Sequence, residues 1–153
     1  MGIKSFTGKR TKQGKSNSEA INVSDYMTRN LIVFNPKQSV MEVMDQLIKH
    51  RISGGPVVNE KQELVGIISE GDCIKQISES RYYNQPMENI NVEKHMVTNV
   101  ETINGDMNIF DAAEKFLKSK RRRFPIIKDG KLVGQISQKD ILKAAIDLKG
   151  HTW

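Results

Sequence analysis

The chain has 153 residues, of which 37% are hydrophobic and 6% aromatic, with a formal net charge of +6. This length predicts about one domain with a core built mainly from Ile, Val, Leu and Met. No run of about 18 apolar residues is present, so we expect no membrane span. A single cysteine, Cys73, excludes an intrachain disulfide and a cysteine-based zinc site. Because the start is Lys-rich and has no apolar segment, we expect no secretory signal and predict a cytoplasmic protein.

Much of the excess positive charge lies at the start of the chain. Residues 1–20 carry five basic residues against one acidic residue and have little to bury. We therefore predict a flexible basic N-terminal arm over residues 1–21. Two interpretations of the arm stay open: a solvated tail, or an electrostatic contact with RNA or another polyanion through residues 4–15.

The rest of the sequence contains one pattern twice, in the same order. The phrase Gly-x-x-Ser-x-x-Asp occurs at residues 66–72 and 134–140, each time after a Pro-led apolar run. The spacing of about 69 residues predicts two similar subdomains rather than a solenoid. We assign residues 22–80 to the first motif, 81–91 to a linker and 92–150 to the second motif. A cleft between such subdomains is a natural ligand site.

Each copy predicts the same series of elements. In the first copy we expect a turn at 23–27, a strand at 31–34, a helix from 40 to about 51, hairpin strands at 56–58 and 64–68, and a helix from 69. In the second copy we expect a turn at 92–96, a strand at 100–103, a helix at 106–117, hairpin strands at 124–127 and 132–136, and a helix at 140–148. Ser24 is the predicted cap of the first turn, Ser39 with Glu42 forms a predicted capping box, and Gly54-Gly55 should break the first helix.

The two Gly-x-x-Ser-x-x-Asp phrases stand where a strand leads into a helix. In the structural interpretation, Ser69 and Ser137 are N-caps, and Asp72 and Asp140 are the acidic residues that complete each first turn. In the functional interpretation, the free N–H groups and positive end of the helix attract a phosphate, to which the serine hydroxyl can donate. The aspartate carboxylate can accept both hydroxyls of a ribose. Both interpretations use the same geometry and stay open.

With these motifs in order and duplicated, residues 22–148 resemble the CBS-domain family in its two-motif arrangement. The resemblance includes Val23 and Met27 with their counterparts Val92 and Met96, and residues 50–58. It implies an α/β (α+β) fold of two βαββα motifs packed sheet-to-sheet about a pseudo-twofold axis. It further implies clefts for AMP, ADP, ATP or S-adenosylmethionine, a homodimer, an unknown protein target, no enzyme activity and no required cofactor.

The resemblance also assigns site residues by position. Asp72 and Asp140 would hold ribose, and Ser69 and Ser137 the phosphate side. In the first copy the residues that would frame the base are Ile52, Ser53, Gly54, Pro56 and Ile67. The corresponding residues of the second copy are Arg121, Arg122, Arg123, Pro125 and Gln135. The arginines either neutralise ligand phosphates or form a solvated charge run at a helix end.

Other candidate sites are weaker. His50, His95 and His151 are too far apart in sequence for a metal or catalytic spacing, so we expect surface or helix-end roles. The six methionines from Met27 to Met107 favour core or dimer-face packing, and no nucleophile–base pair is recognisable. The alternative function is a protein- or RNA-binding adaptor that uses the basic arm and has vestigial nucleotide clefts.

Overall fold

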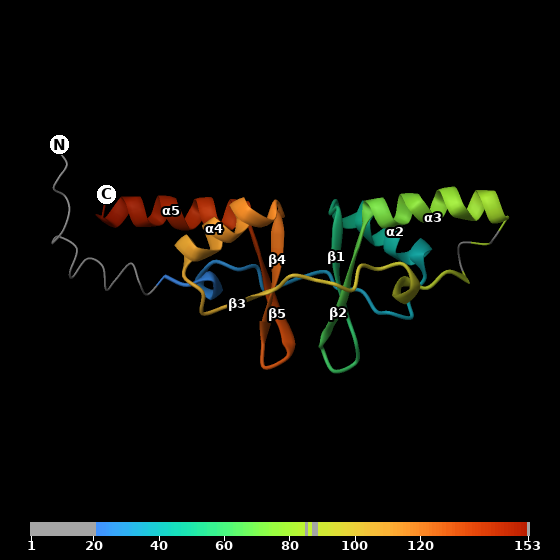
Figure 1. Ribbon diagram of the computed structural model, residues 1–153, viewed down its shortest axis with the longest axis horizontal. Helices are drawn as coiled ribbons and strands as arrows, with labels where there is room; N and C mark the ends of the chain where they lie inside the picture. The colour runs from blue at the N-terminus through green and yellow to red at the C-terminus, as the bar shows by residue number, and fades with distance from the viewer. Residues whose placement is uncertain (1–20, 85, 87–88, 153) are drawn as a thin grey trace. The chain divides into compact units, whose positions relative to one another are not determined.

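The computed structural model describes residues 21–84, 86 and 89–152 (Figure 1). Residues 1–20 of the predicted basic arm and part of the predicted linker lie outside the described residues. Ile21, the last residue of the predicted arm, is half-buried and packs against Ile109, Ala144 and Leu148. The described part is a mixed helix and strand fold, as predicted. Its elements are η1 (Val23–Asp25), α2 (Val40–His50), β1 (Gly54–Val58), β2 (Leu64–Ser69), α3 (Glu70–Tyr83), η3 (Val92–Lys94), β3 (Ile103–Asn104), α4 (Ile109–Ser119), β4 (Arg123–Lys128), β5 (Lys131–Ser137) and α5 (Gln138–Thr152).

The helices and hairpins predicted from the repeat are confirmed, and so is the capping box of α2. The Ser39 hydroxyl accepts from the Glu42 N–H, and the Glu42 carboxylate accepts from the Ser39 N–H. The predicted break at Gly54-Gly55 is wrong, because α2 already ends at His50 and its C-cap, Arg51, takes the left-handed conformation with φ 55°. The two glycines instead belong to β1.

Several predicted boundaries also differ. The strand predicted at 31–34 is reduced to one parallel bridge between Phe34 and Val57. The cap of η1 is Asn22 rather than Ser24. Helix α4 starts at Ile109 rather than at residue 106, because the Asn108 side chain caps it. Helix α3 continues to Tyr83, three residues into the predicted linker.

The chain folds into two compact units that do not coincide with the two sequence copies. Unit 1 contains the described residues 21–29 together with 103–126 and 134–152. Unit 2 contains residues 30–102 together with 127–133. The opening of the first copy, up to Arg29, therefore packs with most of the second copy. The opening of the second copy, which begins with η3 and ends before β3, packs with the first copy.

This exchange uses equivalent hydrogen bonds in both units. In unit 1, the N–H of Val23 donates to the Met107 carbonyl at 2.8 Å, and Thr28 forms an antiparallel bridge with Gln135 of β5. In unit 2, the equivalent N–H of Val92 donates to the Gln38 carbonyl at 2.9 Å, and Val97 bridges Ile67 of β2. Each opening thus adds backbone pairing to the second hairpin strand of the other copy.

The glycine of each Gly-x-x-Ser-x-x-Asp phrase makes room for the exchanged opening. A Cβ placed on Gly66 would lie 2.6 Å from the Met96 sulfur and 2.9 Å from the Val97 carbonyl oxygen. A Cβ on Gly134 would lie 2.6 Å from the Met27 sulfur and would meet a carbonyl oxygen of the same opening at 2.9 Å. The repeated glycine and the repeated methionine are therefore packing partners.

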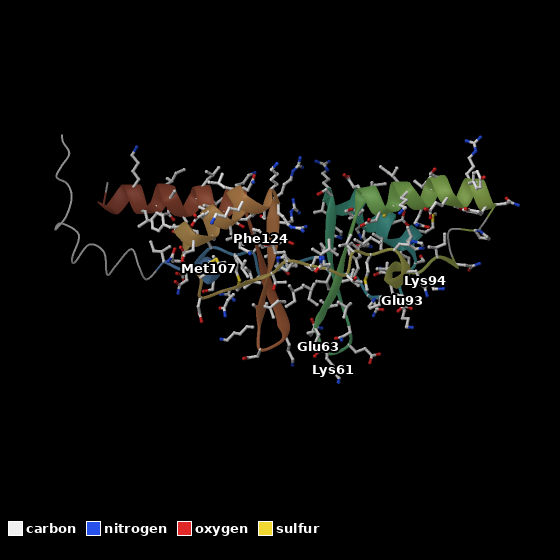
Figure 2. All side chains as sticks on the ribbon, viewed as in Figure 1. Lys61, Glu63, Glu93, Lys94, Met107 and Phe124 are labelled. Atoms are coloured by element: carbon white, nitrogen blue, oxygen red, sulfur yellow. The ribbon has the colours of Figure 1, made fainter. Side chains whose placement is uncertain are left out.

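Each unit has its own apolar core. In unit 1, Phe124 lies on β4 (Figure 2) and its ring is fully buried. This ring lies 4.8 Å from the Phe116 ring of α4, centroid to centroid. In unit 2, the helices and hairpin bury residues of the second copy's opening as well as their own. That cluster consists of Phe34, Val40, Val43, Leu47, Val57, Ile68, Cys73, Ile90 and Val92.

Candidate functional site

The hairpin of unit 2 brings the first copy's candidate residues to one corner. Strands β1 and β2 are antiparallel, with Gly54 opposite Ser69 and Pro56 opposite Ile67. At the start of α3, the Glu70 N–H donates to the Ser53 carbonyl at 2.8 Å. This bond ties the residues before β1 to the first turn of the helix that carries Asp72. Ile52 is adjacent in sequence and packs against the unit 2 core.

Ser69 and Asp72 bind each other at this corner. The Asp72 Oδ2 atom accepts from the Ser69 N–H at 2.9 Å and from the Ser69 hydroxyl at 3.1 Å. The Ser69 Oγ in turn accepts from the Asp72 N–H at 3.4 Å. The capping interpretation is therefore confirmed here. The hydroxyl directs its single proton at the carboxylate, so a phosphate would have to compete for it.

Unit 1 repeats this arrangement with its own residues. The Asp140 Oδ2 accepts from the Ser137 N–H at 2.9 Å and from the Ser137 hydroxyl at 3.0 Å. The first N–H of α5, from Gln138, donates to the Arg122 carbonyl at 3.2 Å. Asp140 is 8% exposed, so its carboxylate is a buried acceptor at the helix start.

The remaining second-copy candidates lie on the strands of the same hairpin or directly before it. Arg123 is the first residue of β4 and half-buried, and Pro125 is buried in the same strand. Gln135 lies in β5, where its backbone pairs with the opening at Thr28. Arg121 precedes β4, and its carbonyl accepts from the Gln138 side chain at 3.3 Å. The structure thus gathers the seven candidates of each copy within one unit.

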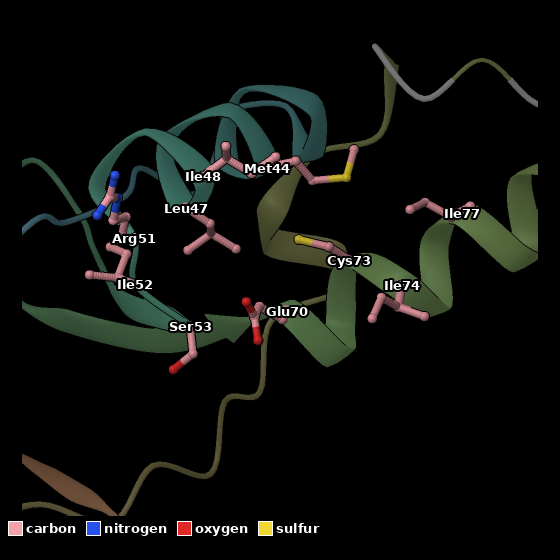
Figure 3. A pocket seen from close by; sticks show the side chains of 10 residues that line it. All are labelled: Met44, Leu47, Ile48, Arg51, Ile52, Ser53, Glu70, Cys73, Ile74 and Ile77. Atoms are coloured by element: carbon pink, nitrogen blue, oxygen red, sulfur yellow. The ribbon is translucent and has the colours of Figure 1, made fainter.

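The two corners differ in charge although their backbones correspond. Arg122 and Ser53 are equivalent, since the carbonyl of each accepts the first N–H of the following helix. The residues around that bond are basic in unit 1, whereas Glu70 stands at the first position of α3 in unit 2, close to Ser53 (Figure 3). The sequence reasoning identified the arginines, but it did not identify the backbone bond that makes the positions comparable.

Sequence reasoning also missed a polar contact made by each exchanged opening. In unit 1, the Tyr26 hydroxyl donates to the Asp147 carboxylate of α5 at 2.5 Å. This bond, then burial and the negative charges of Asp147 and Asp25, raises the pKa of Tyr26 to about 12. The phenol therefore stays protonated across the neutral range.

The equivalent residue in unit 2 is His95, which we expected to have only a surface or helix-end role. Its Nδ1 lies 2.6 Å from the Nε2 of Gln76, a residue that is 3% exposed. With the Gln76 Nε2 also donating to Glu79 at 3.2 Å, this contact favours a ring whose Nδ1 accepts, which is the neutral form. Burial is the largest cause that lowers the pKa of His95, and Lys75 adds to it while Glu79 opposes it. The sequence did contain one indication of this role, because His95 lies 69 residues after Tyr26 and so occupies the equivalent position in the repeat.

Cys73 is the small core residue expected from the sequence. It is 3% exposed, and its side chain lies between α3 and α2 (Figure 3). Burial, followed by the charges of Asp72 and Glu70, raises the pKa of its thiol to about 11. The thiol is therefore protonated near neutral pH and is a poor nucleophile.

The helix pairs expose apolar side chains at matching positions. In unit 2 these include Met41 at 39% exposed, Ile48 at 78% and Ile74 at 64%. A groove of about 630 Å³ lies between α2 and α3 beside them (Figure 3). In unit 1 the equivalent positions are also apolar and exposed: Phe110, Leu117 and Leu142. Within residues 21–152 as described, no helix is long and apolar enough to cross a membrane.

Comparison with known proteins gives the same result for both copies. The CBS domain model matches residues 23–79 and again residues 91–147. A 17.7 kDa protein of Acidianus ambivalens is 32% identical over 87% of this chain and 77% of its own length. The methylated protein MJ0556 of Methanocaldococcus jannaschii is 31% identical over 88% of this chain and 79% of its own.

Solved structures have the same fold. CBSX2, a CBS-pair protein from Arabidopsis thaliana, was solved in complex with AMP, and that structure aligns with a TM-score of 0.73 at 29% identity. The alignment covers 84% of this chain and 98% of CBSX2. The CBS domain pair of MJ0100, in complex with 5′-methylthioadenosine and S-adenosylmethionine, aligns with a TM-score of 0.67 at 28% identity, over 84% and 98% of the two chains. The chain belongs to the CBS-domain family and carries two copies of its motif.

Proposed function

We propose that this protein is a non-enzymatic regulatory module that binds an adenosyl ligand of the AMP, ADP and ATP class, or S-adenosylmethionine. The observation that carries the proposal is the Ser–Asp helix start, which occurs in both units with the same bonds. A protein of the same fold, CBSX2, was solved with AMP. No cofactor is required in this proposal, and we place the protein in the cytoplasm.

In the proposed complex each aspartate holds the ribose hydroxyls of one ligand. Asp72 and Asp140 each use Oδ2 for the cap, and a carboxylate has acceptor sites on both oxygens. The remaining N–H groups at each helix start attract the phosphate side. Occupancy then acts on a protein target by favouring the conformation that binds the ligand more tightly.

The test is the effect of ligands on the melting temperature of the full chain. AMP, ATP or S-adenosylmethionine at 100 times its dissociation constant should add about 2.7 kcal/mol, which raises the melting temperature by about 5–10 °C. The double variant Asp72→Asn with Asp140→Asn should lose the shift while keeping an acceptor for each serine N–H. If none of the three ligands moves the melting temperature, the proposal fails and the adaptor function takes its place.

We further propose that the protein is a homodimer joined through its exposed helix faces. The same positions are apolar in both copies, as with Ile48 and Leu117. The helices of unit 2, α2 and α3, carry a formal net charge of −2, and the helices of unit 1, α4 and α5, carry +1. Opposite charges favour contact between the unit 2 helices of one chain and the unit 1 helices of a second copy.

The oligomeric state tests this part of the proposal. Ile48→Lys with Leu117→Lys should convert the dimer into a monomer in sedimentation equilibrium, because charged groups would be buried at the interface. The control is Val33→Lys, which changes an exposed apolar residue outside the four helices. A monomeric wild-type chain, or a double variant that stays dimeric, would contradict the proposed interface.

A further inference from the structure

The positions around the two helix starts differ in formal charge. Arg51 and Lys120 are equivalent, since both are cationic, end a helix and take the left-handed conformation, with φ 55° and 60°. The next three residues are Ile52, Ser53 and Gly54 in unit 2, but Arg121, Arg122 and Arg123 in unit 1. At the helix starts, Glu70-Gly71 in unit 2 corresponds to Gln138-Lys139 in unit 1.

The difference therefore amounts to four positive charges in unit 1 against one negative charge in unit 2. These charges lie at the same places on the two backbones, because Arg122 and Ser53 each accept the first N–H of the following helix. Arg122 and Lys139 are exposed, and so are Ser53 and Glu70. The contrast is therefore presented on the surface beside each Ser–Asp pair rather than buried in the core.

Electrostatics gives the two starts opposite preferences for an anion. A helix N-terminus is already the positive end of the helix dipole, and cations placed there repel it. Each helix start has one aspartate in its first turn, Asp140 or Asp72. Arg122 and Lys139 add positive charge at the α5 start, so a polyanion is favoured there. At the α3 start, Glu70 already supplies a negative charge, so a further anion is disfavoured there.

We propose that the two sites select ligands by phosphate content. The α5 start of unit 1 binds a nucleoside polyphosphate, and the α3 start of unit 2 binds an adenosyl ligand with little negative charge. Arg122 and Lys139 determine the first preference, and Glu70 with the neutral Ser53 determines the second. This inference rests on the proposed adenosyl-binding function and adds a division of labour between the two sites.

The experiment reads one site at a time by titration calorimetry on the full chain. Asp72→Asn leaves the unit 1 site, and Asp140→Asn leaves the unit 2 site. The probes are ATP, AMP and 5′-methylthioadenosine, used without divalent cations so that ATP keeps its full charge. On the Asp72→Asn background, ATP should bind about tenfold more tightly than AMP. On the Asp140→Asn background, 5′-methylthioadenosine should bind at least as tightly as ATP.

Equivalent positions supply a matched pair of swaps. Arg122→Ser should weaken ATP binding to the unit 1 site about tenfold and AMP binding less, and Ser53→Arg should strengthen ATP binding to the unit 2 site about tenfold. Raising the salt concentration should reduce the ATP preference of unit 1, because exposed charges are screened.

Two failures are distinguishable. If adenosyl ligands bind but the ratio of ATP to AMP affinity is equal at the two sites and does not follow the swaps, the division of labour is overturned and the proposed function stands. If no probe binds the wild-type chain, both are overturned.

Discussion

In unit 1 the start of α5 is surrounded by arginines, whereas in unit 2 the start of α3 has Ser53 and Glu70 at the equivalent positions. Beneath these side chains the two units are built alike. Both have the Ser–Asp cap, the bond from the first helical N–H to the preceding loop, and an exchanged opening that pairs with the hairpin. The comparison shows that the repeat keeps the caps and the backbone bonds of the two units, whereas the charged side chains beside the helix starts differ.

The largest expected effect tests the shared framework. Gly66→Ala and Gly134→Ala should each lower the free energy of unfolding by about 1–3 kcal/mol, because the added Cβ would meet a methionine sulfur at 2.6 Å and a carbonyl oxygen of the exchanged opening at 2.9 Å. Urea unfolding measures the loss. The control is Gly71→Ala, whose Cβ would meet only the Ser69 Oγ at 3.7 Å and should stabilise α3 by about 0.4–1 kcal/mol. A Gly66→Ala variant as stable as wild type would contradict the packing role.

The next effect concerns the helix caps, which should be of equal value in the two units. Ser69→Ala and Ser137→Ala should each cost about 1 kcal/mol, since each removes a hydroxyl that accepts a helical N–H. Ser78→Ala, in the exposed part of α3, is the matched control and should be neutral or slightly stabilising. A loss confined to one unit in denaturant unfolding would show that the two caps are not equivalent.

The polar contacts of the two openings should make stability depend on pH in opposite ranges, alkaline for unit 1 and acidic for unit 2. In unit 1, Tyr26→Phe removes the bond to Asp147 and should cost about 0.5–1.5 kcal/mol, towards the lower end because the site is partly exposed. The folded pKa of about 12 lies above the ordinary value of 10.0, so this stabilisation is complete below pH 10 and is lost as the pH rises towards 12. Stability measured from pH 9 to 12 should fall more steeply for wild type than for the variant. The control is Tyr82→Phe, which removes the hydroxyl of an exposed tyrosine.

The smallest expected effect is a loss of stability at acidic pH in unit 2, through His95. Burial lowers the folded pKa of His95 below its ordinary value of 6.5, so the stabilisation from the neutral ring is present above pH 6.5 and is lost as the pH falls through the lowered pKa. His95→Asn keeps an acceptor near Gln76 but does not titrate in this range. The difference in stability between wild type and variant should therefore shrink or reverse on acidification. A difference in stability that does not change with pH would contradict this explanation. The control is His50→Asn, at an exposed histidine.

Much of the fold was predictable because its determinants are local. The Ser39–Glu42 capping box, the hairpins and the two Ser–Asp starts each depend on residues close in sequence. The exchange was not predictable in this way. Val23 and Val92 open their copies in sequence, and only a long-range pairing reveals that each packs with the other copy. The pairing of Gly66 with Met96, 30 positions apart, is equally non-local.

In the candidate site, too, the locally determined features were predictable and the long-range contacts were not. The sequence identified Ser69, Asp72 and the arginine run because motif spacing marks them. It did not place Gln76 beside His95, because a buried glutamine on a helix has no local pattern that names its partner. In unit 1 the equivalent position is Ala144, so even the repeat gives no indication of that contact.

The exchanged openings also have a bearing on how such a chain arose. A half-length ancestor with one motif and the same exchange would have placed its opening on the hairpin of a second copy of itself, so that neither copy was complete alone. Such an assembly depends on protein concentration. Joining two genes end to end makes the same contacts intramolecular, at a high effective concentration. The duplicated gene thus no longer needs a partner molecule to complete its sheets, and its two halves can diverge.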